Sequence, residues 1–454
     1  MLARSLRSNR DFSVFWAVQA LSEVGNAFSL VALPLLVLHT TGSAAQMGLL
    51  TAVAGAASLL TGLVGGAWAD RFDRRRLLML CDAARLVLYG AIPVCWAVSP
   101  QVWLLYVVMA LASVFEMLFK ITYVTAVANL VDKDQIVAAN SRLEATNAIA
   151  YIAGPALAGV VSALLGPTAA VAINAGSFGI SLVGLVFIRL RPTTRPAAGE
   201  ADSRATRAHD LRTGFRTGAA FLWRTPVLRA LTVLLTVTTF LSLGMTDVFI
   251  YHLRHGLGQD ERTVGYVLAL GGVGTCVAAA ATARLRRSWG FGRCWLGAIS
   301  LCSASVLVLG GTGNVSVAAV TICLYSFGMA LGGICSMSLR QQITPDHLLG
   351  RVTSAFWTIH GSLAPLGAAL LTALVGRFGT RGPLTGVALG FLAVVVAAAF
   401  TPVRQRHPEQ TAVQPAAEQT AVLPAPARPA DPAAPKSPAA PSKQSHGDDA
   451  EARR

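Results

Sequence analysis

The sequence predicts an all-α membrane protein with twelve transmembrane helices in two pseudo-symmetric six-helix bundles. Of its 454 residues, 54% are hydrophobic and only 13% are charged, whereas about 25% of residues are charged in ordinary soluble domains. The apolar residues come in runs of about twenty, the length that crosses a bilayer as a helix. A helix also satisfies its own backbone hydrogen bonds inside lipid. These observations exclude a water-soluble enzyme.

Twelve apolar runs account for most of the chain. The first run follows a basic segment, and together they resemble a signal peptide. This run, however, is too long for a signal peptide, contains Glu23 and Asn26, and lacks a small-residue cleavage site. We therefore expect an uncleaved first helix. The breakers Gly166-Pro167 and Gly382-Pro383 precede the sixth and twelfth runs. The predicted spans are 12–38, 46–69, 77–98, 102–127, 143–165, 168–188, 227–251, 263–283, 294–311, 315–338, 352–375 and 384–402.

The cations of the connecting loops predict the orientation. Twenty-three Lys and Arg lie in loops on the side of the N-terminus, and only four lie on the other side: Arg254, Arg262, Arg377 and Arg381. Cytoplasmic loops carry the excess of cations. Both termini and the long central loop are therefore expected in the cytoplasm, with the chain in a bacterial inner membrane. The net charge of +15 is thus assigned to loops and not to nucleic-acid binding.

These spans divide the chain into four predicted segments. Residues 1–189 form the first six-helix bundle and residues 227–403 the second. Between them, residues 190–226 form a linker with an amphipathic helix, expected to lie on the inner leaflet. The apolar face of that helix contains Leu211, Phe215, Ala219 and Leu222. Residues 404–454 are rich in Pro, Ala and Gln and are predicted to be a disordered cytoplasmic tail.

The two halves contain related segments. One begins at Asp132 and the other at Thr344, and each has an acidic loop, a helix start and then a step from a small residue to proline. These steps are Gly154-Pro155 and Ala364-Pro365, and the separation is about 210–216 residues throughout. Two six-helix halves in parallel orientation are typical of a transporter that rocks about a site between them.

Three segments resemble the major facilitator superfamily. Residues 66–76, GAWADRFDRRR, are similar to the gating motif between helices 2 and 3, except that Asp73 stands where the family often has Gly. Residues 154–159 resemble the antiporter motif of helix 5, with Ala150 and Ala158 in place of glycines. The opening of the chain is similar to the drug:proton antiporter branch that includes macrolide and siderophore exporters. The matched residues are Gly66, Asp70, Arg71, Arg74 and Arg75 in the first motif, and Gly154, Pro155 and Gly159 in the second.

This resemblance implies particular roles for the gating motif. Asp70 and Arg71 would latch the first half to a helix start of the second half in the outward-open state, where the partial positive charge of a helix N-terminus attracts an anion. Arg71, Arg74 and Arg75 are further expected to pair across the inner gate or to hold anionic lipid. The alternative for all four is a topogenic charge with no further role.

Polar residues inside the spans mark the candidate cavity, since each is costly in lipid. Spans 3, 6, 9 and 12 have no charge in their interiors, and Asp82 and Arg85 are assigned to the cytoplasmic end of span 3. The resemblance implies that these four helices are outer supports. The candidate residues on the other spans are Gln19, Glu23 and Asn26 at i, i+4 and i+7; Glu116 and Lys120; Tyr151; Asp247; and Trp357 and His360.

Glu23 is the predicted proton-coupling residue, because a carboxyl group in a poorly hydrated cavity can take up and release a proton as access alternates. A packing role is its alternative. Glu116 and Lys120 either bind protons or substrate or form a structural ion pair. Asp247 is either an outer gate or an interfacial residue. His360 is a proton relay or a packing residue. Tyr151 and Trp357 stack on a cationic substrate or fill the core.

The predicted function is proton-coupled export of a small amphipathic, drug-like molecule by alternating access. The alternatives are an exporter of an endogenous siderophore or antibiotic, an importer of a metabolite, and a non-transporting scaffold or receptor. We expect no enzyme activity, cofactor, metal or ATP site, because no phosphate-binding loop and no cluster with metal-ligand spacing occurs in the sequence. The expected partners are a small-molecule substrate, protons and the lipid bilayer, and the expected state is a monomer.

Overall fold

The computed structural model describes residues 9–69, 72–131, 135–188, 215–345 and 348–408, and no strand occurs within these ranges. The first half contains α1 (Arg10–Thr41), α2 (Ala44–Ala69), α3 (Arg74–Val98), α4 (Val102–Leu130), α5 (Ile136–Leu165) and α6 (Pro167–Phe187). The second half contains α8 (Pro226–Ser242), α9 (Met245–Tyr251), the π-helix η3 (His252–Gly256), α10 (Glu261–Gly311), α11 (Val315–Ile343), α12 (Leu349–Gly361), α13 (Ala364–Phe378), α14 (Arg381–Ala399) and the short η5 (Pro402–Arg404).

Eleven helical stretches among the described residues are long and apolar enough to cross a membrane. The longest, α10, bends at Gly290, where φ is 77°. A left-handed backbone favours glycine because it has no Cβ. The eighth and ninth predicted spans fall on the two arms of this bent helix, so the eleven stretches provide twelve crossings. The predicted all-α membrane fold is confirmed.

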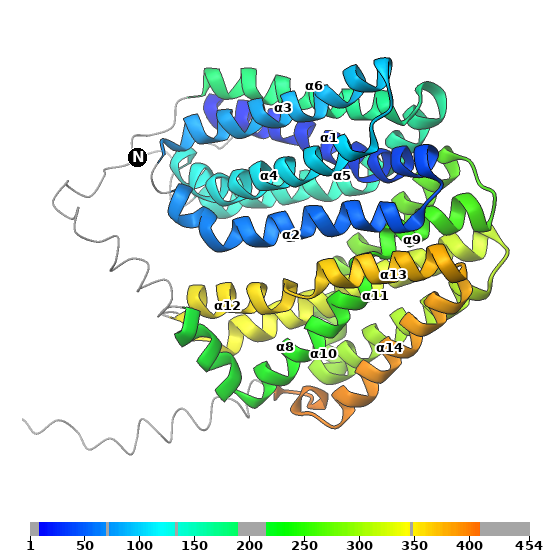
Figure 1. Ribbon diagram of the computed structural model, residues 1–454. Coiled ribbons are helices and arrows are strands. Elements are labelled where there is room, and N and C mark those ends of the chain that lie inside the picture. The colour runs from blue at the N-terminus through cyan, green and yellow to red at the C-terminus, as the bar shows by residue number, and fades with distance from the viewer. Residues whose placement is uncertain (1–8, 70–71, 132–134, 189–214, 346–347, 409–454) are drawn as a thin grey trace, which may run out of the picture. The chain divides into compact units, whose positions relative to one another are not determined.

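The two halves repeat one packing pattern. In the first half, α1 packs against α5 and α6, α3 against α4 and α6, and α2 against α4. In the second half, α8 packs against α12, α13 and α14, and α10 packs against α11 and α14. The seventh to twelfth spans are, in order, α8/α9, the two arms of α10, α11, α12/α13 and α14. Numbered in this way, the helix pairs of the second half correspond to those of the first half. Figure 1 shows the helices of each half grouped together.

The largest contacts between the halves are also equivalent. They join α5 to α10 and α2 to α13, which are the fifth span with the eighth and the second with the eleventh. Exchanging the halves converts one pair into the other. The packing therefore has the pseudo-twofold relation that the internal repeat predicts.

The end of the predicted linker packs against the protein core. Residues 215–224 are helical, but Leu222 is fully buried within the hydrophobic core, and Phe215 and Ala219 pack against that core. A Cβ on Gly218 would lie 2.2 Å from the carbonyl oxygen of Arg351 in α12. The apolar face of residues 215–224 is thus covered by protein, whereas the placement of the linker on the inner leaflet stays a prediction. Leu211 lies outside the described residues.

The start of the predicted tail is held against the bend in α10. The backbone N–H of Phe291 donates to the carbonyl of Arg406, and the N–H of Gly292 donates to that of Gln405. These bonds satisfy amide groups that the bend removes from the helical pattern. The remainder of the predicted tail, residues 409–454, lies outside the described residues.

Candidate functional site

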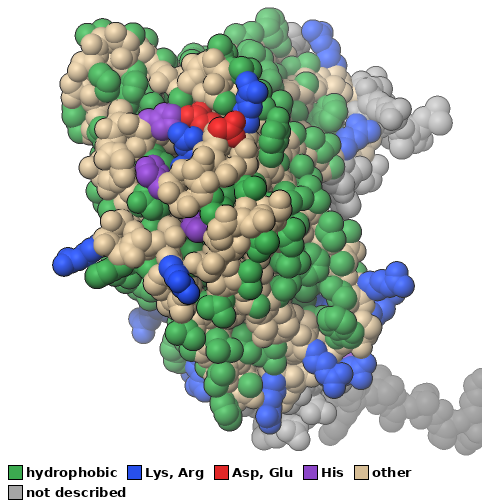
Figure 2. Space-filling model, turned by 90° about the vertical axis from the view of Figure 1, so that its right-hand side faces the viewer, with side chains coloured by type: hydrophobic (Ala, Val, Ile, Leu, Met, Phe, Trp, Pro, Cys, Tyr) green, Lys and Arg blue, Asp and Glu red, His purple; other side chains and the backbone are tan. Residues whose placement is uncertain are grey.

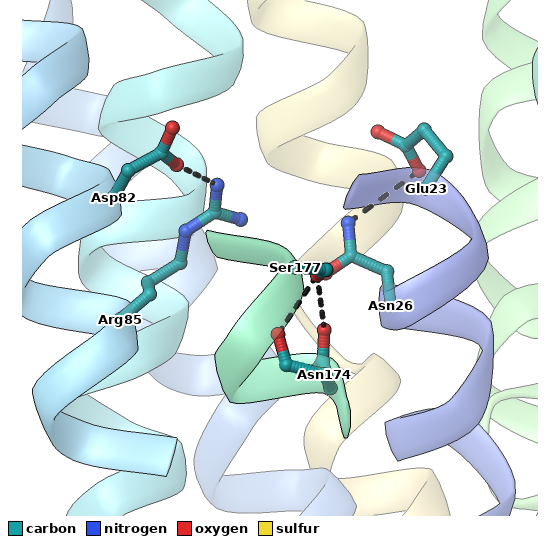
Figure 3. A network of polar contacts seen from close by, with 6 residues as sticks. All are labelled: Glu23, Asn26, Asp82, Arg85, Asn174 and Ser177. Carbon is teal, nitrogen blue, oxygen red and sulfur yellow. Dashed lines mark hydrogen bonds and ion pairs between the residues drawn. The ribbon is translucent and has the colours of Figure 1, made fainter. Parts of the chain in front are cut away.

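The predicted polar face of α1 lies inside the first half. Gln19 is buried, and Glu23 and Asn26 are half-buried. The side-chain amide of Asn26 donates to Oε2 of Glu23 over 3.5 Å (Figure 3). The spacing i, i+4, i+7 places these three side chains on one side of a helix, and the structure places two of them in mutual contact.

Charged groups from two further helices act on Glu23. They are Lys120 and Glu116 of α4 and Arg85 of α3. Lys120 and Glu116 form the predicted ion pair, and their side chains are 64% and 36% exposed. A pair so open to its surroundings is not part of a packed core. Glu23 therefore belongs to a group of charged residues contributed by α1, α3 and α4.

The side chains of the two aromatic candidates are also exposed. Tyr151 of α5 is 51% exposed and Trp357 of α12 is 53% exposed. The repeat aligns Pro155 with Pro365, and these aromatic residues precede their respective prolines by four and eight residues. Residues four apart share a helix face, so Tyr151 and Trp357 occupy the same face of equivalent helices, about one turn apart.

His360 is engaged by its neighbours in the second half. Its Nε2 atom lies 3.0 Å from the hydroxyl of Thr239 in α8, and its ring stacks on Phe356 at 5.0 Å. Trp357 meets the same imidazole edge-on at 5.5 Å. The guanidinium carbon of Arg340 lies 3.6 Å from the Phe356 ring. The imidazole of His360 therefore has a hydrogen-bond partner and a stacking partner, whereas the neighbouring side chain of Trp357 is exposed.

Asp247 lies at the boundary between the halves. Its side chain is buried, and it accepts a hydrogen bond from Thr51 of α2. Asp247 thus connects the second half to α2 of the first half, and its assignment as an outer gate or an interfacial residue stays a prediction.

An ion pair that the sequence analysis assigned to the edge of span 3 lies in the interior. Asp82 and Arg85 of α3 are 2.7 Å apart and almost fully buried. Figure 3 shows the two side chains facing each other. The guanidinium carbon of Arg85 also lies 4.1 Å from the ring centroid of Phe178 in α6 and 4.8 Å from that of Phe119 in α4. The sequence analysis placed these two charges at one end of span 3 but did not predict that other helices enclose them. The i, i+3 spacing of opposite charges was the available signal.

A second polar group joins α1 to α6. The amide of Asn174 donates to the hydroxyl of Ser29, and Ser177 donates to the backbone carbonyl of Asn174 over 2.8 Å (Figure 3). A Cβ on Gly25 would lie 2.2 Å from the Ser177 hydroxyl. Small and polar residues let transmembrane helices approach closely and bond across the contact. This contact supports α1 beside the polar face.

The antiporter-like motif on α5 makes two close contacts. A Cβ on Gly154 would lie 2.1 Å from that of Ala27 in α1. A Cβ on Gly159 would lie 2.5 Å from the carbonyl of Glu261 and 2.7 Å from the Cα of Gly265, both in α10. The motif therefore packs α5 on α1 within one half and on α10 of the other.

The described part of the gating motif caps helices. Asp73 is the N-cap of α3, which begins at Arg74, and accepts a bond from the backbone N–H of Arg76. Arg75 donates to the carbonyls of Leu185 and Val186 at the end of α6, where a cation is favoured. Asp73 thus has a structural role where the family often has Gly. Asp70 and Arg71 lie outside the described residues, and Gly66 lies within α2.

The halves meet closely at one end of the bundle. We call the end where α1 begins the proximal end and the end where α1 finishes the distal end. At the distal end, Nε2 of His39 lies 2.9 Å from Oε1 of Glu261 in α10 and 3.2 Å from Nη2 of Arg254 in η3. Figure 2 shows acidic, basic and histidine side chains gathered on this end.

Close backbone contacts lie on the same side of the bundle. The Gly159–Gly265 contact is near the distal ends of α5 and α10, and a Cβ on Gly48 of α2 would lie 1.7 Å from the hydroxyl of Thr372 in α13. Together with the His39 contacts, they close the distal end across the two halves.

Two equivalent helical halves, a polar interior and a closed end define the class: a secondary transporter of the membrane. The chain belongs to the Major Facilitator Superfamily, whose family model matches residues 15–368. This confirms the resemblance found in the sequence.

Two of the similar proteins are named as exporters. The chain is 28% identical over 388 residues to the multidrug efflux pump Tap of Mycolicibacterium fortuitum, covering 83% of this chain and 92% of that one. It is 24% identical over 420 residues to the enterobactin exporter EntS of Escherichia coli O9:H4 (strain HS), covering 91% and 96%. A bacterial homologue of the human lysosomal transporter Spinster shares the fold, with a TM-score of 0.68, 12% identity and coverage of 90% of this chain and 98% of that one.

Proposed function

We propose that this chain exports a small amphipathic molecule in exchange for protons. The observation that carries the proposal is the position of Glu23, a carboxyl group within a membrane span that faces Asn26 and the charges of Lys120, Glu116 and Arg85. A group of this kind can carry a proton while access alternates. Export is supported by the likeness to Tap, a multidrug efflux pump.

The open aromatic residues support an amphipathic substrate. Tyr151 and Trp357 lie on the equivalent faces of α5 and α12, and both rings are about half exposed. Aromatic faces attract cations and bind apolar surfaces. A substrate with an apolar body and a positive charge suits both these rings and the carboxyl group of Glu23, for which it would compete with the proton.

We assign the proximal end to the cytoplasm because the loops there hold most of the cations. In this orientation the described conformation is closed on the outside by the His39–Glu261 and Gly159–Gly265 contacts. An outwardly closed state is the one that takes up a substrate from the cytoplasm. Two single cysteines in a cysteine-free variant test the assignment: Gly313→Cys should react with a membrane-impermeant maleimide in whole cells, and Ser288→Cys only after lysis. The reverse pattern would overturn the orientation.

The test of proton coupling uses the purified chain in proteoliposomes with a pH gradient. Ethidium serves as the cationic probe, and proton flux is followed with a trapped pH-sensitive dye. Glu23→Gln should abolish ethidium-evoked proton flux and accumulation driven by the gradient. Asp11→Asn, the same chemical change in the first turn of α1, is the matched control and should behave as the wild type. Equal flux in wild type and Glu23→Gln would refute the assignment.

A second candidate, export of an endogenous siderophore, is supported by the likeness to EntS. A catecholate siderophore is anionic, so Lys120, and not Glu23, would then attract it. Enterobactin loaded into the same proteoliposomes distinguishes the two candidates. Transport of enterobactin that is lost in Lys120→Gln, with ethidium not transported, would favour the siderophore.

A further inference from the structure

An apolar groove lies on the second half, away from the charged residues around Glu23. Its volume is about 550 Å³, and it is formed between α8, α13 and α14. Phe240 and Leu241 of α8 line it, together with Leu370 and Leu374 of α13 and Gly386 of α14. Its lining consists of hydrophobic side chains, proline and glycines, so nothing in it could orient a polar ligand by hydrogen bonds.

The groove opens within the membrane-spanning part of the fold. The helices that form it are candidate membrane spans, and the side chains of Leu370 and Phe378 at its edge are 51% and 65% exposed. Unlike the region around Glu23, this surface has no polar side chain in its lining, and such a surface suits hydrocarbon. The neighbours available to fill this groove are therefore lipid chains.

Two arginines stand where the groove reaches the distal end of the bundle. Arg377 is in the last turn of α13, and its guanidinium carbon lies 5.6 Å from the ring of Phe378, which lines the groove. Arg381 begins α14, directly before Gly382, another lining residue. Both arginines are exposed, and neither forms an ion pair with a residue in the described part of the chain. They are two of only four cations in the distal loops.

We propose that this groove binds an acyl chain of an anionic phospholipid from the distal leaflet, with the lipid phosphate held by Arg377 and Arg381. A lipid chain gains little by leaving one hydrocarbon environment for another, so the apolar groove alone would not select a lipid. Selection comes from the guanidinium groups, which bind phosphate through charge-assisted hydrogen bonds. The groove fixes where the chain lies, and the arginines decide which headgroup binds.

The structure supplies a variant that fills the groove without disturbing the helices. Gly386 lines the groove, and a Cβ built on it meets no atom within 4 Å. Gly386→Leu should therefore fold and occupy the space of the lipid chain. Gly297→Leu in α10 is the matched control, because Gly297 is also exposed and equally free of neighbours but lies outside the groove.

The experiment titrates the purified, delipidated full chain in detergent with phosphatidylglycerol or phosphatidylcholine of identical chains and counts bound lipids by native mass spectrometry. We expect one tightly bound phosphatidylglycerol, with phosphatidylcholine bound more weakly. Arg377→Ala and Arg381→Ala should each weaken phosphatidylglycerol binding about fivefold, whereas Arg262→Ala, at another distal arginine, should not. Gly386→Leu should remove the bound lipid, and Gly297→Leu should retain it.

Equal binding of the two lipids, or retention of the lipid by Gly386→Leu, would overturn the proposal. A change in ethidium transport by Gly386→Leu without a change in lipid binding would assign the groove to the substrate instead and would also overturn it. The lipid count needs no transport, so its outcome is independent of the proposed export function.

Discussion

His39 of α1 and Glu261 of α10 face each other across the two halves, with 2.9 Å between the imidazole Nε2 and the carboxylate oxygen. Glu261 is nearly buried, and its Oε2 atom has no hydrogen-bond partner among the described residues. The same imidazole nitrogen also lies 3.2 Å from Arg254. One side chain of the first half thus meets an anion and a cation of the second half, at the end where the bundle is closed.

Replacing His39 should loosen this closure. A partly exposed pair contributes up to about 1 kcal/mol, so His39→Ala should raise the ratio of distally open to closed molecules by about fivefold at most. Spin labels at Ser43 and Gly313, one in a distal loop of each half, allow the separation to be measured by pulsed electron resonance. Labels on a Ser13→Ala background, altered near the proximal end, serve as the control. An unchanged distance distribution in His39→Ala would contradict a closing role.

Glycine at position 159 is needed for the contact between α5 and α10. A methyl group there would lie 2.5 Å from a backbone oxygen of Glu261, a distance at which backbone must move. We expect Gly159→Ala to cost about 1–3 kcal/mol and to separate the distal labels further. Gly176→Ala in α6, where a Cβ meets nothing within 4 Å, should leave both thermal stability and label distance unchanged. If both variants behave alike, the contact is not tight in the membrane.

The buried Asp82–Arg85 pair should be intolerant of losing one partner. Asp82→Asn leaves the guanidinium of Arg85 without its counter-charge in an enclosed site, and breaking such a pair costs about 3–5 kcal/mol. Chemical unfolding in detergent micelles measures this loss. The double variant Asp82→Leu, Arg85→Met removes both charges and should be less destabilised than Asp82→Asn alone. The opposite order would mean that Arg85 reaches another anion or water.

The N-cap of α10 should make a pH-dependent contribution to stability. Asp260 accepts a bond from the backbone N–H of Thr263 over 2.9 Å. Hydrogen bonds from the side chain of Thr263 and from this N–H hold the pKa of the carboxyl below its ordinary value of 3.8. A lowered pKa in the folded state means that the contribution is complete above pH 3.8 and is lost as the pH falls through the lowered pKa.

Asp260→Ala should therefore cost about 1 kcal/mol at pH 7, with a smaller cost at pH 2. Melting temperatures of wild type and variant at the two pH values give the difference directly. Asp260→Asn, which retains a capping oxygen without a charge, should show little change between them. A cost for Asp260→Ala that does not vary with pH would show that the carboxylate charge has no part in the cap.

Local patterns account for the residues that the sequence analysis identified. The face containing Gln19, Glu23 and Asn26 follows from helical spacing, and Glu116 with Lys120 follows from the i, i+4 rule. Neither inference needs a neighbouring helix. The structure retains both arrangements.

Contacts between distant segments account for what was missed. The burial of Arg85 depends on Phe119 and Phe178, which two other helices bring over its guanidinium. The covered face of residues 215–224 depends on the core contributed by other helices. A hydrophobic face predicts burial, but it does not predict whether lipid or protein will cover it.

By itself, the sequence determined the membrane class, the number of crossings, the repeat and the family, because hydrophobic run length, loop charge and motif spacing are properties of consecutive residues. The tertiary structure decided which end is closed and which charges are enclosed. Those properties arise where helices from both halves meet, as at Gly159 with Gly265 and His39 with Glu261. The pattern of residues within one helix does not specify which helix it will contact. These pairs can therefore be identified only from the packed structure.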